Sequence, residues 1–238
     1  GGGRFGCWTC TVVDKQKHLG NFIEHGEEWM ETLVELRQEL KDTQDSEAWE
    51  KVREKKRRHG RVELKSDGSG DYTPGPYTMD FRKQYLEKLL LGQIKIQKEG
   101  PNPNQTLILD EEIHEIQRIW RMEQGDWQNS AYQIYYKVTG KKLESVKEDM
   151  GGFGEMEAEL LQQVCTKHSV PSKLVSTLLN LEFENQGATR HSKIYGKIKS
   201  ELTKEWRDDM TQIMKELTLE QAEKENVKPN AFNKSNPQ

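Results

Sequence analysis

The 238-residue chain has three cysteines, too few for the disulfide framework that stabilises many small secreted proteins. It also lacks any run of about 18 uncharged apolar residues, which excludes a membrane-spanning helix. Because the chain starts with glycines and shows no apolar segment behind a charged one, we expect no secretory signal. These absences favour a protein of the reducing cytoplasm with no membrane partner.

Familiar phosphate-binding and catalytic motifs are missing as well. The sequence contains neither a G-x-x-x-x-G-K-[ST] segment nor a Ser-Gly-Gly-x-Asp-Ser segment, and no Ser/His/Asp arrangement stands out. The residues alone therefore identify no catalytic centre.

A strong excess of charge of one sign is also missing. The 36 Lys and Arg residues stand against 40 Asp and Glu residues, so the net charge of −4 does not indicate a nucleic-acid-binding protein. Charged residues make up 32% of the chain and apolar residues only 33%, which predicts a thin core. We expect this core to be spread over long amphipathic helices.

Apolar residues recur at helical spacing through most of the chain, and this pattern predicts a mainly α-helical fold. Leu33, Leu36 and Leu40, for example, fall on one stripe at steps of three and four. Stretches rich in glycine and proline separate the helical patterns. The expected helices cover 22–40, a short turn around 49–52, 79–91, a helix that starts at 110, an aromatic segment at 132–138, and then 155–168, 171–185 and 194–214.

Changes in composition divide the chain into four expected parts. The sharpest change is a basic segment with eight basic residues against two acidic ones, a net charge of +6 in fifteen positions. The expected parts are a Cys-containing segment at 1–20, a helical region at 21–150 that includes the basic segment 51–65 and a loop at 66–77, a second helical region at 151–218, and a flexible tail at 219–238.

Cys7 and Cys10 form a C-x-x-C pair, which lets two sulfur atoms turn toward one ion. Iron–sulfur clusters and zinc are held in this way, but each needs further ligands. A redox pair or two buried structural thiols are the alternatives. Cys165 lies within an apolar helical pattern and is interpreted as a core cysteine. The histidines make no zinc-finger spacing with the pair, and we interpret three of them as surface or packing residues: His18, His25 and His59.

Arg57, Arg58 and Arg61 are the candidate phosphate-binding residues of the basic segment, because the run of charge is mostly of one sign and we expect these arginines to lack acidic partners. The alternative is a solvated helix face, which is what runs of charge usually form. Aromatic residues at 120–136 have the spacing of core residues, and we favour that role over base stacking.

The segment Arg4-Phe5-Gly6-Cys7-Trp8-Thr9-Cys10-Thr11-Val12-Val13 resembles the cysteine motif of the DndC-type sulfurtransferases of bacterial DNA phosphorothioation. This family is related to the phosphoadenosine phosphosulfate reductases. Further blocks resemble it in the same order, so that the likeness covers most of 4–185. These blocks are Arg57-Arg58-x-Gly60, Pro74-Gly75-Pro76-Tyr77-Thr78, Glu111-Glu112 and Ile116-x-x-Ile119-Trp120-Arg121.

The resemblance implies an activity that the residue patterns alone do not reveal. It implies insertion of sulfur into the DNA backbone, with a [4Fe–4S] cluster held by cysteines that include Cys7 and Cys10. It further implies ATP bound in an N-terminal α/β domain of the adenine-nucleotide α-hydrolase type, a cysteine desulfurase as sulfur donor, and other Dnd proteins as partners. Because such a domain and an initial Met are missing here, we expect the chain to be the C-terminal, helical part of a longer protein.

Two alternatives stay open from the sequence. One is an enzyme similar to phosphoadenosine phosphosulfate reductase, which would act on a small sulfonucleotide and need no DNA. The other is a zinc-stabilised helical binding module without catalysis. Iron–sulfur absorbance in the purified protein would favour the sulfurtransferase or the reductase. A colourless protein with bound zinc would favour the binding module.

Overall fold

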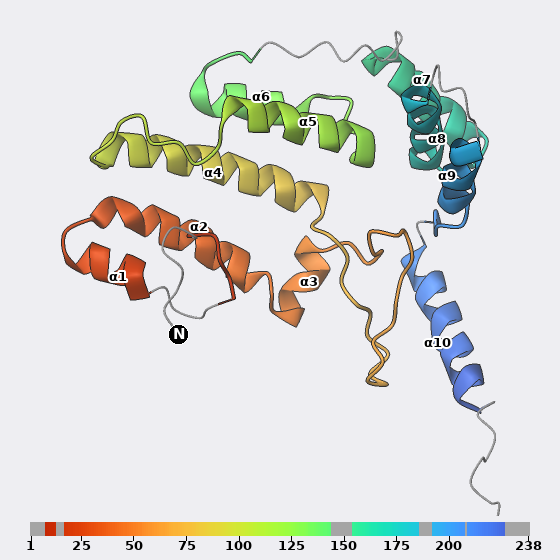
Figure 1. Ribbon diagram of the computed structural model, residues 1–238. Helices are drawn as coiled ribbons and strands as arrows, with labels where there is room; N and C mark the ends of the chain where they lie inside the picture. Colours follow the sequence, from red (N-terminus) through yellow and green to blue (C-terminus); the bar gives the residue numbers. More distant parts are fainter. Residues whose placement is uncertain (1–7, 13–16, 144–153, 186–191, 208, 227–238) are drawn as a thin grey trace, which may run out of the picture. The chain divides into compact units, whose positions relative to one another are not determined.

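The computed structural model describes residues 8–12, 17–143, 154–185, 192–207 and 209–226 (Figure 1). These residues are mainly helical, which confirms the predicted fold class, and the only strand-like pairings among them are two isolated antiparallel bridges. Contacts between residues divide the chain into two units. The first unit comprises Gly1–Arg53 and Tyr77–Leu202, and the second comprises Glu54–Pro76 and Thr203–Gln238.

This grouping differs from the division expected from composition. The second unit unites much of the basic segment with residues near the end of the chain, and composition carries no signal for contacts between such distant segments. Within the described residues, no helix is both long and apolar enough to span a bilayer.

The N-terminal helices are shorter than their apolar pattern predicts. The structure has α1 at Lys17–Glu24, a 3-10 turn at Glu28–Met30, α2 at Glu31–Asp42 and α3 at Ser46–Val52. The prediction of one helix over 22–40 is wrong, because Gly26 has a φ of 99° and ends the first helix in a left-handed conformation. The predicted helical turn around 49–52 is confirmed by α3.

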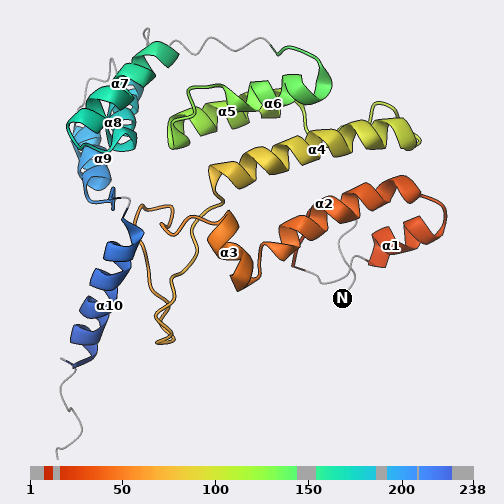
Figure 2. The ribbon, with the colours of Figure 1, turned by 180° about the vertical axis from the view of Figure 1, so that it is seen from behind.

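Helix α4 spans Met79–Glu99 and lies beside α2 in both views (Figures 1 and 2). The predicted N-cap is confirmed, since Thr78 Oγ1 accepts a hydrogen bond from the Phe81 N–H at 3.3 Å. The helix continues past the predicted end and stops before Pro101. Close contact between the two helices depends on Gly92, where an added Cβ would lie 3.0 Å from Leu36 and 3.2 Å from Thr32.

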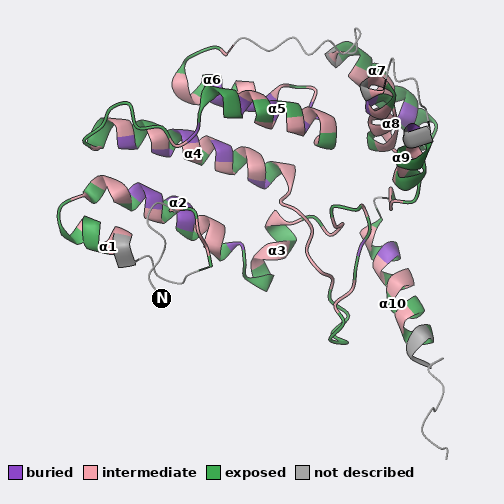
Figure 3. Ribbon diagram, viewed as in Figure 1, coloured by how far each residue is buried: buried purple, intermediate pink, exposed green. Residues whose placement is uncertain are grey.

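Helix α6, Ser130–Thr139, packs against α4 and against α5, Asp110–Gln124, and the three helices share the main core. Figure 3 shows buried positions recurring along α2, α4 and α5 between exposed ones. The predicted core role of the aromatic residues at 120–136 is confirmed for Trp120 and Tyr135, which are 5% and 7% exposed, but it is wrong for Tyr136, which is 54% exposed. The core cluster consists of Leu86, Leu90, Ile108, Ile113, Trp120, Ala131 and Tyr135.

A polar network is buried beside this core and joins α5 to the start of α6. Gln117, 1% exposed, donates through Nε2 to the carbonyl and carboxylate oxygens of Asp126, both at 3.2 Å, and accepts the Ala131 N–H at 2.9 Å. Asp126 also accepts the Ser130 N–H at 2.9 Å and its O–H at 2.6 Å. Lys83 Nζ lies 3.7 Å from Asp126 Oδ1. These buried polar groups are therefore hydrogen-bonded, as burial requires.

Helices α7, Glu155–Lys167, α8, Ser172–Glu184, and α9, Ser192–Leu202, complete the first unit. Helix α8 contacts α5, where Lys173 Nζ donates to Gln124 Oε1 at 3.1 Å and Asn180 Nδ2 lies 3.5 Å from the Met122 carbonyl oxygen.

In the second unit, α10 spans Met210–Asn226. The prediction of one helix over 194–214 is wrong, because α9 ends at Leu202 and Asp209 caps α10 by accepting the Gln212 N–H at 3.0 Å. Helix α10 also continues beyond Leu219, where the sequence predicts a flexible tail.

Replacement of Gln117 by Met should destabilise the protein while keeping the side-chain volume. The substitution removes the Gln117 partner of the buried Ala131 N–H and of the Asp126 carbonyl oxygen, which costs about 1–3 kcal/mol of unfolding free energy. Denaturant unfolding followed by circular dichroism measures the loss. The control is Gln133→Met, at an exposed position of α6. Equal stability of the two variants would contradict the role of the network.

The half-buried hydroxyl group of Tyr85 should make the folded protein less stable at alkaline pH. Its hydroxyl donates to the Leu36 carbonyl oxygen at 3.2 Å, and burial, with a smaller effect of the Glu39 carboxylate, raises its pKa to about 12. Above pH 10 the unfolded chain therefore loses this proton before the folded one, which favours unfolding. We expect the unfolding free energy to fall less steeply between about pH 10 and 12 in Tyr85→Phe than in the wild type. Parallel pH profiles would refute this.

Candidate functional site

The described part of the cysteine motif is held on helix α2. Arg37, 3% exposed, donates through Nε to the Cys10 carbonyl oxygen at 2.8 Å. Gln44 Nε2 donates to Thr11 Oγ1 at 2.7 Å, so that two side chains from one helical region fix this stretch. Cys10 itself is half-buried with a free thiol, and Cys7 lies outside the described residues.

The described residues do not complete a metal or cluster site. Among them, no group of three or more Cys, His, Asp or Glu side chains is placed to hold a metal ion. Thiolates are suitable ligands for an iron–sulfur cluster, yet the described residues supply only Cys10 at this place. The predicted core role of Cys165 is confirmed, because it is 4% exposed on α7.

The histidines of the described region have other contacts. The ring nitrogen of His25 is 2.6 Å from the Asn21 carbonyl oxygen, and that of His59 is 2.9 Å from Glu63 Oε1. Both histidines are exposed, as the interpretation of them as surface residues predicts. The side chain of His18 lies outside the described residues.

The basic segment forms an irregular hairpin of the second unit and not the face of a long helix. Leu64 forms an antiparallel bridge with Tyr72, flanked by hydrogen bonds of 2.7 Å from Lys65 N to Asp71 O and from Thr73 N to Glu63 O. At the open end of the hairpin, Gly75 N donates to the Glu54 carbonyl oxygen at 2.7 Å.

Gly75 explains part of the Pro-Gly-Pro sequence at 74–76. A Cβ at this position would overlap the carbonyl oxygen of Lys56. Only glycine therefore allows the two sides of the hairpin to approach this closely.

The three candidate arginines differ in their surroundings. Arg57 Nε lies 3.5 Å from Glu63 Oε2, and Arg57 Nη1 donates to the Pro74 carbonyl oxygen at 3.0 Å. The expectation that Arg57 lacks an acidic partner is therefore wrong, because the hairpin brings Glu63 back to it. Arg58 and Arg61 are exposed, and no ion pair involves either of them within the described part of the chain. Of the three candidates, these two thus keep the solvent exposure that a phosphate contact requires.

Other basic side chains of the segment have partners inside the protein. The Arg53 guanidinium lies 3.6 Å from the ring centre of Tyr77, and Lys65 Nζ lies 3.0 Å from Asp71 Oδ2. Lys56 Nζ donates to the carbonyl oxygen of Arg207 at 2.7 Å. Much of the local positive charge thus has a structural role, and the number of basic residues overstates how many are free to bind a ligand.

Sequence reasoning missed Arg37, although a signal for it exists. Arg37 follows Leu36 and stands four residues after Leu33, so it is a charged residue on the apolar face of a helix. Such a residue needs an internal partner, and the carbonyl group of Cys10 is one. The contact of Lys56 with the Arg207 carbonyl oxygen had no comparable signal, because the two residues are 151 positions apart in the sequence.

One comparison with known families gives a match. Residues 156–200, a range that overlaps α7, α8 and α9, match the family model Sp-DndD, described as a small protein found in certain Dnd DNA modification systems. The match links the protein to these systems and indicates other Dnd proteins as partners. It lies outside the cysteine motif and does not distinguish a DndC-type protein. No curated protein and no solved structure matches the chain.

The matched segment leaves a row of apolar side chains on the surface. Met156, Leu160 and Val164 follow one another at four-residue spacing on α7 and are 80%, 61% and 48% exposed. The opposite side of α7 carries the buried Cys165 and contacts α8.

Charge reversal at Arg58 and Arg61 should weaken binding to duplex DNA and flatten its dependence on salt. Loss of two phosphate contacts reduces the slope of log K against log salt by about two. Fluorescence anisotropy with a labelled duplex at several salt concentrations measures both effects. Arg57→Glu alone is the comparison, and we expect a smaller loss because this side chain is already paired. Unchanged binding of the double variant at low salt would exclude the contact.

Proposed function

We propose that this chain is the helical part of a DndC-type sulfurtransferase, which replaces a non-bridging oxygen of a DNA phosphate with sulfur. The observation that carries the proposal is that two separate segments point to one system. The segment 4–13 resembles the cysteine motif of this family, and 156–200 matches a small protein found in Dnd systems. Both likenesses are to proteins of Dnd systems, and DNA phosphorothioation is the reaction that we propose for the chain.

Cys7 and Cys10 contribute two thiolate ligands to a [4Fe–4S] cluster in this proposal. The contact of Arg37 with the Cys10 carbonyl group supports it, because a buried side chain then sets the position of the motif on α2. When bound, the cluster supplies iron that is able to carry the sulfur. The remaining cysteine of this sequence, Cys165, is buried on α7, so the other ligands come from elsewhere in the full-length protein.

The DNA backbone contacts Arg58 and Arg61 in this proposal. Their exposure and their position outside ion pairs of the described residues support this role. ATP activates the target phosphate by adenylation in an α/β nucleotide-binding domain of the full-length protein. A cysteine desulfurase supplies the sulfur in the cytoplasm, and other Dnd proteins are further partners.

Replacement of Cys7 or Cys10 by Ser should remove the cluster from the full-length protein. Serine offers no soft sulfur ligand, so iron and acid-labile sulfide should fall to background after anaerobic purification, together with the absorbance at about 400 nm. Cys165→Ala is the matched control, since this thiol is buried on α7 and its loss should leave the iron content unchanged.

A colourless wild-type protein with bound zinc would contradict the proposal and favour the zinc-stabilised module. Full iron content in both serine variants would refute the assignment of these two ligands.

A further inference from the structure

The candidate arginines of the basic segment stand on a tight turn. Gly60 N donates to the Arg57 carbonyl oxygen at 2.8 Å, and Arg57 N donates to the Arg61 carbonyl oxygen at 2.8 Å. Gly60 has a φ of 77°, which a side chain would strain. The closed turn places Arg58 and His59 at its tip, and Arg61 follows directly.

A distant segment of the same unit holds this turn. Glu205 N donates to the Gly60 carbonyl oxygen at 2.8 Å, and Lys56 Nζ donates to the Arg207 carbonyl oxygen at 2.7 Å. The backbone of Gly60 also packs so closely on Lys204 that an added Cβ would lie 2.6 Å from its side-chain carbons. The segment 204–207 therefore contacts the turn and the chain that leads into it.

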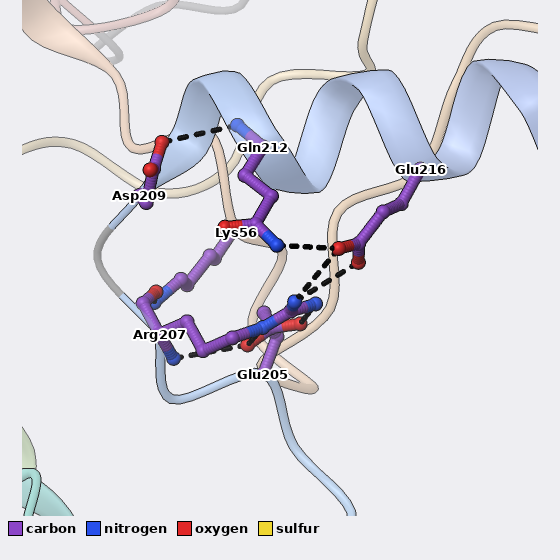
Figure 4. A network of polar contacts seen from close by, with 6 residues as sticks. All are labelled: Lys56, Glu205, Arg207, Asp209, Gln212 and Glu216. Atoms are coloured by element: carbon purple, nitrogen blue, oxygen red, sulfur yellow. Dashed lines mark hydrogen bonds and ion pairs between the residues drawn. The ribbon is translucent and has the colours of Figure 1, made fainter.

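Arg207 connects this segment to α10 (Figure 4). Its guanidinium donates to both carboxylate oxygens of Glu205, at 3.0 Å from Nε and 2.7 Å from Nη2, and Nη1 lies 2.9 Å from Glu216 Oε2. Gln212 Nε2 donates to Glu216 Oε1 at 2.9 Å and fixes that carboxylate on the helix. The hydrogen bond from Arg207 lowers the pKa of Glu205, which keeps the pair charged at neutral pH.

Single exposed ion pairs contribute little to stability, but a bidentate pair within a network is the favourable exception. The Glu205 side chain is only 20% exposed, compared with 49% for Arg207. The network thus fixes Glu205, whose N–H donates to the Gly60 carbonyl oxygen.

We infer that Arg207 is a positioning residue for DNA binding: its ion pairs with Glu205 and Glu216 hold the turn at 57–61 so that Arg58 and Arg61 meet the phosphate backbone together. The inference rests on the proposed phosphate contact of these two arginines. Ordering the turn before DNA arrives removes an entropy cost from binding. Arg207 acts through the turn and does not itself touch the DNA.

Removal of negative charge distinguishes the positioning role from a simple effect of net charge on DNA binding. Glu205→Gln with Glu216→Gln removes two negative charges, which by charge alone strengthens the attraction to DNA. The positioning role predicts the opposite, because the neutral side chains hold the guanidinium of Arg207 less firmly.

The test measures binding of the full-length protein to a labelled DNA duplex by fluorescence anisotropy over a range of salt concentrations. The variant E205Q/E216Q should bind about three- to tenfold more weakly. The slope of log K against log salt should fall by about one. The control E220Q/E223Q makes the same charge change at exposed positions of α10 and should bind equally well or more tightly.

Arg207→Lys is a milder variant that keeps the positive charge but loses the planar fork. It should also weaken binding, whereas a direct phosphate contact of Arg207 would tolerate lysine. Circular dichroism and the unfolding midpoint report the fold of each variant. Wild-type or tighter binding by E205Q/E216Q, or wild-type binding by Arg207→Lys, would overturn the inference.

The variant R58A/R61A distinguishes failure of the inference from failure of the contact on which it rests. Normal DNA binding by R58A/R61A would refute the phosphate contact itself. Weak binding by R58A/R61A together with full binding by E205Q/E216Q would refute the positioning role alone.

Discussion

The ring of Tyr77 joins three helices of the first unit, and the rest of that unit depends on this junction. The Arg53 guanidinium at the end of α3 lies 3.6 Å from the ring centre, and Phe81 in α4 stacks on the ring at 4.6 Å. The Tyr77 hydroxyl is 2.7 Å from Thr43 Oγ1 at the end of α2. Arg53 and Tyr77 also form an antiparallel bridge. The residue before the basic hairpin therefore lies beside the residue that follows it. The Arg53–Tyr77 bridge therefore fixes both ends of the hairpin.

Helix α2 also contacts the cysteine motif and sets its position. One side of the helix packs on α4, where Gly92 allows close approach, and Arg37 reaches the Cys10 carbonyl oxygen. The position of Cys10 thus follows from helix packing and from a single buried guanidinium. Disturbing the packing of α2 on α4 should change the motif without a substitution in the motif itself.

The periodicity of apolar residues predicted helices that continue without a break, such as α7 and α8. It failed where the pattern continues across a break in the helix. Ile198, Leu202 and Trp206 keep helical spacing, yet the helix ends at Leu202, because the next residues bond to Gly60 and Glu205 pairs with Arg207. Such contacts have no local signal. For the candidate site, the sequence indicates the cysteine pair and the basic segment, but only the hairpin reveals that Glu63 neutralises Arg57 while Arg58 and Arg61 stay exposed.

Under the proposed function, the cysteine motif and helices α7–α9 belong to an enzyme that places sulfur in the DNA backbone. Mass spectrometry of nuclease-digested genomic DNA detects phosphorothioate linkages directly in the source organism. The account predicts these linkages in the wild type, their loss when the gene for this chain is deleted, and their return when the full-length gene is restored. Phosphorothioate at the wild-type level in the deletion strain, or none in the wild type, would contradict it.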